Sequence, residues 1–383
     1  MDIKRILNLK SLLKKKSFFL FGPRQVGKSY LIKKQLSDCA LIVNLLDNEM
    51  NYRLQRDPSY LKALINNKTK KQRYVVIDEI QKIPELLNWV HLFIEEKRIT
   101  FLLTGSSSRK LKKQNVNLLA GRAWNAELFP LSWYEIPNFS LKRKLLFGSL
   151  PSVYLSKNPL EELKAYVANY LILEIQMEGL VRKLPQFHSF LKGSALSNTQ
   201  ILNFSKIGND YGLPSSSVRD YYEILQDLLI GFMVNPWKGS QKRKAVSKSK
   251  FYFFDIGLVH LLCDVKMLNE HSDFYGRSFE HFIAGEIKAY LSYFRKDDSL
   301  QYWQSRYGHE VDFIIGDHTA VEVKSSKRIS KSDLKTLKML AEEQKLKNFF
   351  IVSRDETPAK YGNIQSLYWE EFLKKLWKHQ ILQ

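Results

Sequence analysis

SFFLFGPRQVGKSYLIKKQL, residues 17–36, joins a short apolar run to a glycine-bounded loop and then to a helical pattern. The loop fits GxxxxGK[ST] at every fixed position, and a strand before it and a helix after it are the context that this motif needs. Glycines let the backbone curl so that its N–H groups, with the positive end of the following helix, face a phosphate. The predicted phosphate-binding residues are Gly22, Pro23, Arg24, Gln25, Val26, Gly27, Lys28 and Ser29. We expect Lys28 to reach the β- and γ-phosphates of ATP and the Ser29 hydroxyl to ligate Mg²⁺.

Two later apolar runs end in polar residues that suit the same ligand. Tyr74–Ile77 is followed by Asp78 and Glu79, as in a buried parallel strand that delivers carboxylates to its C-terminal edge. We expect Asp78 to hold Mg²⁺ through water and Glu79 to polarise the attacking water. Ile99–Leu103 is followed by Thr104, which is placed to touch that water or the γ-phosphate. Each run alone could be an ordinary core strand, but the three in this order predict nucleotide hydrolysis.

Stretches over most of the chain resemble the AAA+ ATPases, and most closely the bacterial and archaeal group whose ATPase domain precedes a C-terminal domain of uncharacterised function. The matching stretches are FGPRQVGKSYL, VVIDEIQKIPELL, FLLTGSSSRKL, LLAGRAWNAELFPLSWYEI, FYFFDIGL, GRSFEHFIAGEI and EVDFII with AVEVKSS. The resemblance implies a homo-oligomer such as a hexameric ring. It makes Arg122 a candidate arginine finger for a neighbouring subunit's γ-phosphate, with Arg109 in reserve. A structural salt bridge is the equal alternative for Arg122.

The fold class is α/β, with four expected parts. An AAA+-like ATPase domain covers residues 1–136, and a helical lid or connector covers 137–190. A winged-helix-like module with a basic loop covers 191–250, and an α/β domain that resembles a nuclease covers 251–383. The helix-turn-helix pattern of the third part has its turn at residues 210–214 and offers Arg219 to a groove or backbone of nucleic acid; the alternative is a spacer or interaction module. Its basic loop offers Lys242, Arg243 and Lys244 to phosphates, or is simply solvated.

The last part follows the order helix, three strands, helix, strand, with the helix over 276–292 and strands near 300–304, 310–315 and 319–324. That order resembles the PD-(D/E)XK nuclease core. The resemblance implies that Asp312 and Glu322 share a metal ion, that Glu280 completes its shell, and that Lys324 orients or deprotonates the attacking water. Two alternatives stay open: the charges neutralise one another as a buried cluster, or the scaffold binds nucleic acid without cutting.

Charge and composition point to a polyanionic partner. Sixty Lys and Arg against thirty-nine Asp and Glu give a net charge of +21 over 383 residues, which favours nucleic acid, DNA first, over an anionic membrane surface. Two cysteines and the lack of an apolar leader or span favour a cytoplasmic protein with no membrane partner. The leading expectation is an ATP-driven DNA motor or remodeller of the helicase or branch-migration kind. The alternatives are an ATP-regulated metal-dependent nuclease and a nucleotide-dependent interaction switch in defence or toxin-type regulation.

Overall fold

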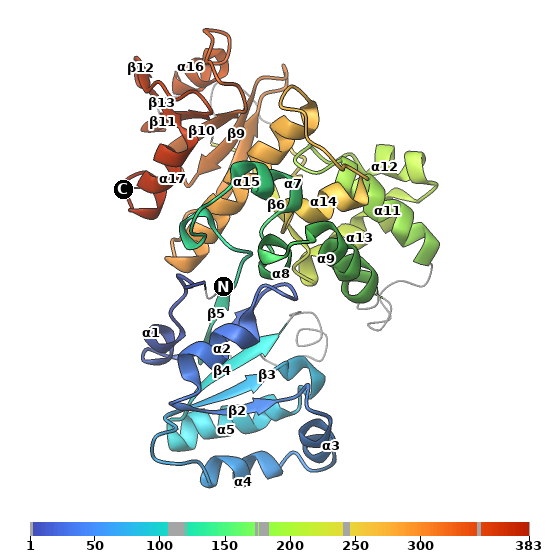
Figure 1. Ribbon diagram of the computed structural model, residues 1–383, viewed down its shortest axis with the longest axis vertical. Helices are drawn as coiled ribbons and strands as arrows, with labels where there is room; N and C mark the ends of the chain where they lie inside the picture. The colour runs from blue at the N-terminus through green and yellow to red at the C-terminus, as the bar shows by residue number, and fades with distance from the viewer. Residues whose placement is uncertain are drawn as a thin grey trace. The chain divides into compact units, whose positions relative to one another are not determined.

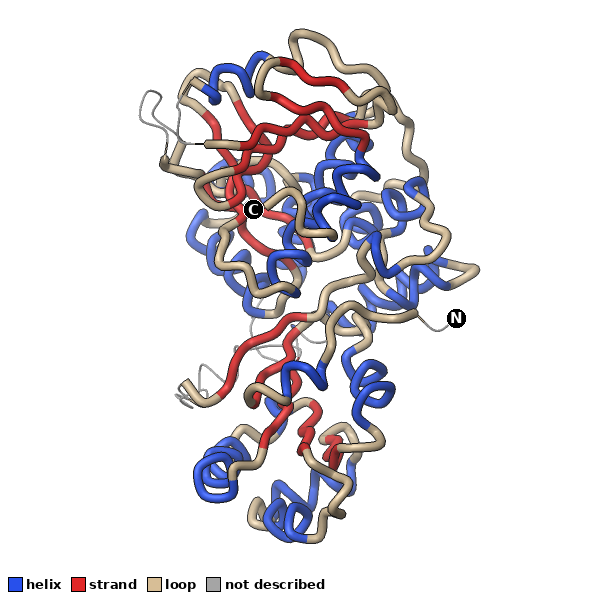
Figure 2. The backbone as a smooth tube through the Cα atoms, turned by 90° about the vertical axis from the view of Figure 1, so that its left-hand side faces the viewer, coloured by secondary structure: helices blue, strands red, loops and turns tan. Residues whose placement is uncertain are grey.

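The computed structural model describes residues 3–105, 119, 121–172, 175, 184–239, 246–342 and 346–382. These fall into two compact units, which we call the nucleotide unit (Asp2–Pro130 with Asp227–Ile230) and the C-terminal unit (Leu131–Gln226 with Gly231–Gln383). Figure 1 labels the helices and strands of both units, and Figure 2 shows the strands in red against helices in blue. No helix in the described ranges is long and apolar enough to cross a membrane.

A five-stranded parallel sheet organises the nucleotide unit, with strand order β2-β3-β4-β1-β5. Both strands predicted after the loop motif are present as β3 and β4, and every residue of β1 is buried, as expected for central strands of a parallel sheet. The strands are β1 (Ser17–Phe21), β2 (Ala40–Asn44), β3 (Tyr74–Asp78), β4 (Thr100–Gly105) and β5 (Ala123–Glu127). The helices are α1 (Leu9–Leu13), α2 (Lys28–Leu36), α3 (Asn48–Arg56), α4 (Tyr60–Asn66), α5 (Leu86–Lys97) and the short η1 (Ile80–Lys82).

An eight-stranded mixed sheet organises the C-terminal unit, with strand order β12-β13-β11-β10-β9-β8-β6-β7. The strands are β6 (Gly231–Pro236), β7 (Lys250–Phe253), β8 (Leu300–Gln304), β9 (Glu310–Ile315), β10 (Thr319–Lys324), β11 (Asn348–Ser353), β12 (Ala359–Tyr361) and β13 (Ile364–Tyr368). The strands predicted over 300–304, 310–315 and 319–324 are therefore confirmed. Their apolar residues alternate or run continuously as a buried sheet requires.

Helices surround this sheet. The first are η2 (Trp133–Glu135), α7 (Leu141–Phe147), α8 (Pro151–Leu155), α9 (Pro159–Tyr166), η3 (Val167–Ile172) and α11 (Leu184–Leu196). They are followed by α12 (Phe204–Tyr211), α13 (Ser215–Asp227), α14 (Ile256–Leu262), α15 (Asp273–Tyr293), α16 (Lys335–Ala341) and α17 (Trp369–Trp377). The long helix expected over 276–292 is α15, which contacts β10 and α17.

The structure differs from the expected division of residues 137–383 into three parts. Helices α12 and α13 form the predicted helix-turn-helix, and Gly212 ends α12 in the left-handed conformation with φ 64°. The hairpin after them is not a separate wing. Its strand β6 pairs antiparallel with β7 and also parallel with β8, so backbone hydrogen bonds make the hairpin an edge of the C-terminal sheet. The expected boundary at residue 250 therefore lies inside one unit.

One buried carboxylate joins the first and last segments of the C-terminal unit. Glu286 on α15 is 2% exposed. It accepts hydrogen bonds from the Trp133 backbone N–H at 2.8 Å and from the Trp377 indole N–H at 3.0 Å. Burial raises the pKa of Glu286 to about 7, although the Lys144 ammonium and both hydrogen bonds act against that rise. Loss of this side chain would leave two buried donors without an acceptor.

Glu286→Ala is therefore expected to lower the free energy of unfolding of the C-terminal unit by about 2–4 kcal/mol, because each unsatisfied buried donor costs roughly 1–3 kcal/mol. Urea unfolding followed by tryptophan fluorescence measures the change. Glu223→Ala is the matched control, since Glu223 is an exposed helical glutamate of the same unit and should change stability by less than about 0.5 kcal/mol. Equal effects of the two substitutions would contradict the role given to Glu286.

Candidate nucleotide site and carboxylate cluster

The phosphate-binding loop lies between β1 and α2, as the motif predicts. Three of its residues have positive φ: Gly22 at 156°, Gln25 at 61° and Gly27 at 95°. A Cβ atom on Gly22 would lie 2.5 Å from the Leu128 carbonyl oxygen, a separation that only glycine permits here. Val26 is fully buried, while Arg24 and Gln25 are half-buried. The sequence thus forms a tight turn whose backbone can approach a phosphate closely.

The Lys28 ammonium lies over this loop. It donates hydrogen bonds to the carbonyl oxygens of Gly22 at 2.6 Å and Pro23 at 3.0 Å. Lys28 is 6% exposed, so its charge is held within the loop and not in open water. A phosphate that enters the loop would offer this ammonium a charged oxygen, and a charge-assisted hydrogen bond is roughly twice as strong as a neutral one.

Asp78 connects the loop to the two neighbouring strands. Its Oδ2 accepts a hydrogen bond from the Ser29 hydroxyl at 2.8 Å, and its Oδ1 accepts one from the Thr104 hydroxyl. Because β4 lies between β1 and β3, Thr104 is held between the loop and the acids. A hydroxyl and a carboxylate are oxygen ligands of the kind that Mg²⁺ prefers, so Ser29 and Asp78 suit Mg²⁺.

Glu79 is held in an unusual backbone conformation beside Asp78. Its φ is 63° and its ψ is 47°, the left-handed region that costs a residue with a side chain of order 1 kcal/mol or more. The Glu79 N–H donates to the Thr104 hydroxyl oxygen at 2.9 Å, and the Gln81 side-chain amide donates to the Glu79 carboxylate. These two contacts fix both ends of the residue. Sequence analysis missed Gln81, since an amide two positions from an acid carries no motif.

Arg5 is a second contributor that sequence analysis missed. It is 8% exposed. Its guanidinium donates to the Val26 carbonyl at 2.7 Å and to the Phe129 carbonyl at 2.6 Å. One side chain from the start of the chain thus braces the phosphate-binding loop against the segment after β5. The residues it connects are 21 and 124 positions away, so no local pattern could have indicated the contact.

Arg122 forms an ion pair with Glu95 of α5. This is the contact that the structural alternative for Arg122 requires. Both side chains are partly open to solvent, with exposed fractions of 37% and 53%, and exposed ion pairs contribute little to stability. The Arg122 guanidinium also lowers the pKa of Glu95 through a hydrogen bond and its charge. The pair would have to break for Arg122 to reach a neighbouring subunit. Arg109 lies outside the described residues.

The charged residues predicted near the C-terminus form two clusters in place of one. Lys250, at the start of β7, lies among three carboxylates that are contributed by α15 and β9. Its Nζ is 2.5 Å from Glu310 Oε1, 3.2 Å from Glu280 Oε1 and 4.0 Å from Asp312 Oδ1. The Tyr252 hydroxyl donates to Glu280 Oε1 at 2.5 Å. Sequence analysis grouped Lys250 with the cations of the basic segment that suit phosphate. It did not single out Glu310, although Glu310 precedes Asp312 by two and therefore shares its face of β9.

Glu322 and Lys324 pair with each other on β10. The Lys324 ammonium donates to Glu322 Oε1 at 2.6 Å, and Glu322 Oε2 is buried without a hydrogen-bond partner. Burial and the nearby Asp312 raise the pKa of Glu322, while Lys324 lowers it. Asp312 Oδ2 instead accepts the Val323 N–H at 2.8 Å, so the two strands hold the acids close together.

The expected metal shell of Glu280, Asp312 and Glu322 is not formed. Within the described ranges, no group of three or more His, Cys, Asp or Glu side chains is arranged to hold a metal ion. The physical reason is that these carboxylates already have cationic partners. Lys250 forms ion pairs with Glu280 and Glu310, and Lys324 forms one with Glu322. This arrangement corresponds to the neutralised polar cluster that the sequence left open as an alternative.

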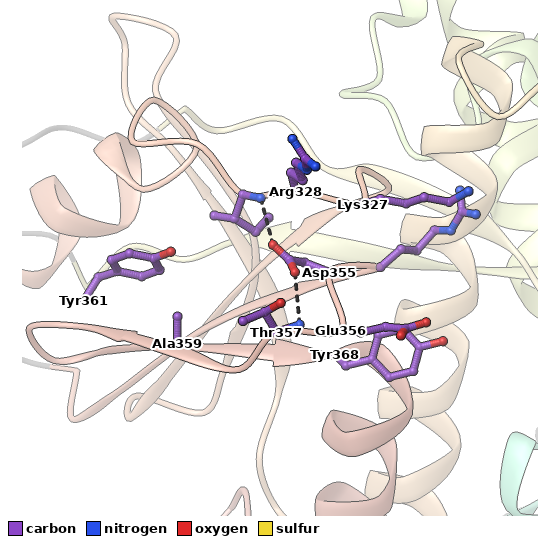
Figure 3. Close-up of a pocket in the computed structure, with 10 residues that line it drawn as sticks. Lys327, Arg328, Asp355, Glu356, Thr357, Ala359, Tyr361 and Tyr368 are labelled. Atoms are coloured by element: carbon purple, nitrogen blue, oxygen red, sulfur yellow. Dashed lines mark hydrogen bonds between the residues drawn. The ribbon is translucent and has the colours of Figure 1, made fainter.

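Two adjoining hollows lie beside the C-terminal ends of β10 and β11 in the eight-stranded sheet. The first, about 670 Å³, includes Glu280, Asp312 and Lys324 in its lining. The second, about 570 Å³, is drawn in Figure 3 and presents Arg328, Tyr361 and Tyr368. They share Lys327 and Arg354, and both of these cations pair with Glu270, which lowers the pKa of Glu270 to about 2.

The other predicted nucleic-acid contacts are placed only in part. Arg219 is exposed on α13, and its guanidinium lies 5.8 Å from the centre of the Phe204 ring. Tyr222 of the same helix is fully buried, so this side of α13 faces the core. Lys242, Arg243 and Lys244 lie outside the described residues.

Three family models match successive parts of the chain. Residues 14–137 match a model described as an AAA domain. Residues 138–269 and 275–372 match two models, each described as a domain of unknown function. The chain is also 24% identical over 307 residues to an uncharacterized protein of Mycobacterium tuberculosis, a match that covers 77% of this chain and 66% of that protein. An uncharacterized protein of Methanocaldococcus jannaschii is 25% identical over 346 residues, covering 82% and 75%.

Among solved structures, the Walker-type ATPase of Pyrococcus abyssi is similar, with 14% identity and a TM-score of 0.44 over 66% of this chain and 93% of that chain. The family match and the geometry around Asp78 agree on the same stretch of sequence. Residues 14–137 therefore form an AAA-type P-loop ATPase domain.

Proposed function

We propose that the chain hydrolyses ATP with Mg²⁺ at the edge of the parallel sheet. The observation that supports this most directly is the double contact of Asp78 with Ser29 and Thr104. It gathers the phosphate-binding loop, a metal-holding carboxylate and a hydroxyl that can touch the γ-phosphate at one place. In this proposal Lys28 neutralises phosphate charge, Ser29 and Asp78 hold Mg²⁺, and Glu79 orients and polarises the attacking water.

Glu79→Gln should bind ATP normally and hydrolyse it at least ~100-fold more slowly, because an amide keeps the shape but not the basicity of the carboxylate. Lys28→Ala should instead lose ATP binding, since it removes the counter-charge for the phosphates. Phosphate release and nucleotide binding are measured on the purified full chain. The control is Glu85→Gln, the same change at an exposed carboxylate before α5, which should leave both properties unchanged. Near-normal turnover by Glu79→Gln would refute the assignment.

We propose further that the chain acts as a homo-oligomer, a hexameric ring being the reference case, in which Arg122 reaches a neighbouring subunit's nucleotide. The partial exposure of Arg122 and of its ion-pair partner Glu95 supports this role, since an exposed pair is easily exchanged. A planar guanidinium also suits the charge that develops on a transferring phosphoryl group.

Mixing Arg122→Ala with Lys28→Ala subunits should restore part of the ATPase activity, because each variant supplies the group that the other lacks. Glu95→Gln separates the two roles of Arg122, since it removes the ion pair and leaves the arginine. A finger predicts near-normal activity for Glu95→Gln, whereas a structural salt bridge predicts that Glu95→Gln and Arg122→Ala behave alike. Specific activity that is independent of dilution in a strictly monomeric sample would also rule out the finger.

We propose that the C-terminal unit binds nucleic acid, DNA in the first instance, and does not cut it. The net charge of +21 and the cations that line the adjoining hollows, Lys324, Lys327 and Arg354, support an electrostatic platform. The ammonium of Lys250 among Glu280, Glu310 and Asp312 favours binding over metal-dependent cleavage. ATP hydrolysis would then drive a motor or remodeller along a bound strand or duplex.

Replacing Lys242, Arg243 and Lys244 together with Gln should reduce the slope of log affinity against log salt by about 2–3 on duplex DNA, since each neutralised phosphate contributes about 0.9. Fluorescence anisotropy over a salt series measures the slope. Lys68, Lys70 and Lys71 replaced with Gln remove the same charge from a loop of the nucleotide unit and should leave the slope unchanged. Equal slopes in all three proteins would place the contact elsewhere, and ATPase that ignores every nucleic acid would favour an interaction switch.

A further inference from the structure

Lys250 is the most deeply buried cation of the C-terminal sheet cluster. Its side chain is 3% exposed, against 16% for Glu280, 13% for Asp312 and 30% for Glu310. Burial by itself would lower the pKa of Lys250, but the charges of Glu280, Asp312 and Glu310, with a contribution from Tyr252, raise it well above its ordinary value. These charges favour the ammonium form of Lys250, and the carboxylate oxygens are arranged around that cation.

The coordination of this ammonium resembles that of a metal ion in composition. Oxygens of Glu310 and Glu280 lie at 2.5 Å and 3.2 Å from Nζ, and Asp312 follows at 4.0 Å. The face of the Tyr302 ring lies 5.4 Å from the same atom, which is within reach of a cation–π contact. The neighbours of this ammonium are therefore carboxylates and one aromatic face.

One ammonium does not balance the charge of the three carboxylates around it. Glu280, Glu310 and Asp312 could carry three negative charges against one, while Lys324 is already paired with Glu322. Burial raises the pKa of Glu280, with Lys250 acting in the opposite direction. Without Lys250, these carboxylates would have no cation within contact among the side chains that the structure describes. Buried carboxylates in that state bind a cation or become protonated.

We propose that the Lys250 ammonium replaces a divalent metal ion in this carboxylate cluster. The chain with Lys250 in place binds no divalent cation there, and removal of the ammonium converts the cluster into a divalent-cation site. The ligands of that site are Glu280, Glu310 and Asp312, because hard divalent cations take carboxylate oxygens. This inference concerns only the cluster and does not depend on ATP hydrolysis or on what the C-terminal unit binds.

The substitution Lys250→Met tests the exchange, since methionine fills much of the lysine stem and has no charge. Mn²⁺ binding to the nucleotide-free full chain is measured by calorimetry and by the loss of the free Mn²⁺ spectrum in electron paramagnetic resonance. Lys250→Met should bind one more Mn²⁺ per chain than the wild type. Lys250→Met with Asp312→Asn should lose that ion, and Lys250→Arg should gain none because it keeps the positive charge. The phosphate-binding loop is the same in all four proteins, so any Mn²⁺ that it binds contributes equally to all four measurements.

A second comparison keeps Lys250 unchanged, so its result does not depend on whether Lys250→Met folds. Wild type and Asp312→Asn should bind equal numbers of Mn²⁺ ions, and a metal ion lost from Asp312→Asn would overturn the proposal directly. A folded Lys250→Met chain that binds no more Mn²⁺ than wild type would overturn it as well. If Lys250→Met unfolds in metal-free buffer, refolding that requires Mn²⁺ supports the exchange, and failure to refold with Mn²⁺ contradicts it.

Discussion

The nucleotide unit depends on the hydrogen bonds of one carboxylate. Asp78 ends β3 and holds the Ser29 hydroxyl from α2 and the Thr104 hydroxyl from β4. Thr104 in turn receives the Glu79 N–H, so the strained backbone of Glu79 is fixed through the same group. Three segments that are far apart in the sequence thereby meet within hydrogen-bond distance. The parallel sheet allows these contacts because β4 lies between β1 and β3.

The C-terminal unit differs from the nucleotide unit in how its buried charges are paired. Several of its buried charges are paired within the sheet or across helices. Glu286 joins η2 to α17 through two N–H donors, and Lys250 joins β7 to α15 and β9 through carboxylates. Such pairs contribute less to stability than their short distances suggest, because each ion must first lose its water. Their stronger effect is on specificity, since removing one partner leaves a buried charge that favours another arrangement.

Local signals were enough for the phosphate-binding loop and for the strands around it. The fixed spacing of Gly22, Gly27 and Lys28 determines a turn that few residues can adopt, and apolar runs that end in acids identify β3. The strands over 300–324 were also predictable, because their charged residues alternate with buried ones. Arg5 was missed because its partners lie far along the chain. The pairing of Lys250 with Glu310 was missed because it joins β7 to β9. The pairing of β6 with β8 could not be predicted from the hairpin alone, because it depends on residues about 65 positions later in the sequence.

Arg5 has a practical consequence for how the ATPase domain can be isolated. The match to the AAA domain model begins at residue 14, so a fragment cut at that limit would retain every residue of the nucleotide motifs. It would nevertheless lose the guanidinium that joins the Val26 and Phe129 carbonyls, together with the whole of α1. The smallest autonomous ATPase fragment is thus longer than its recognisable sequence, and its first essential side chain precedes its first motif residue by 17 positions.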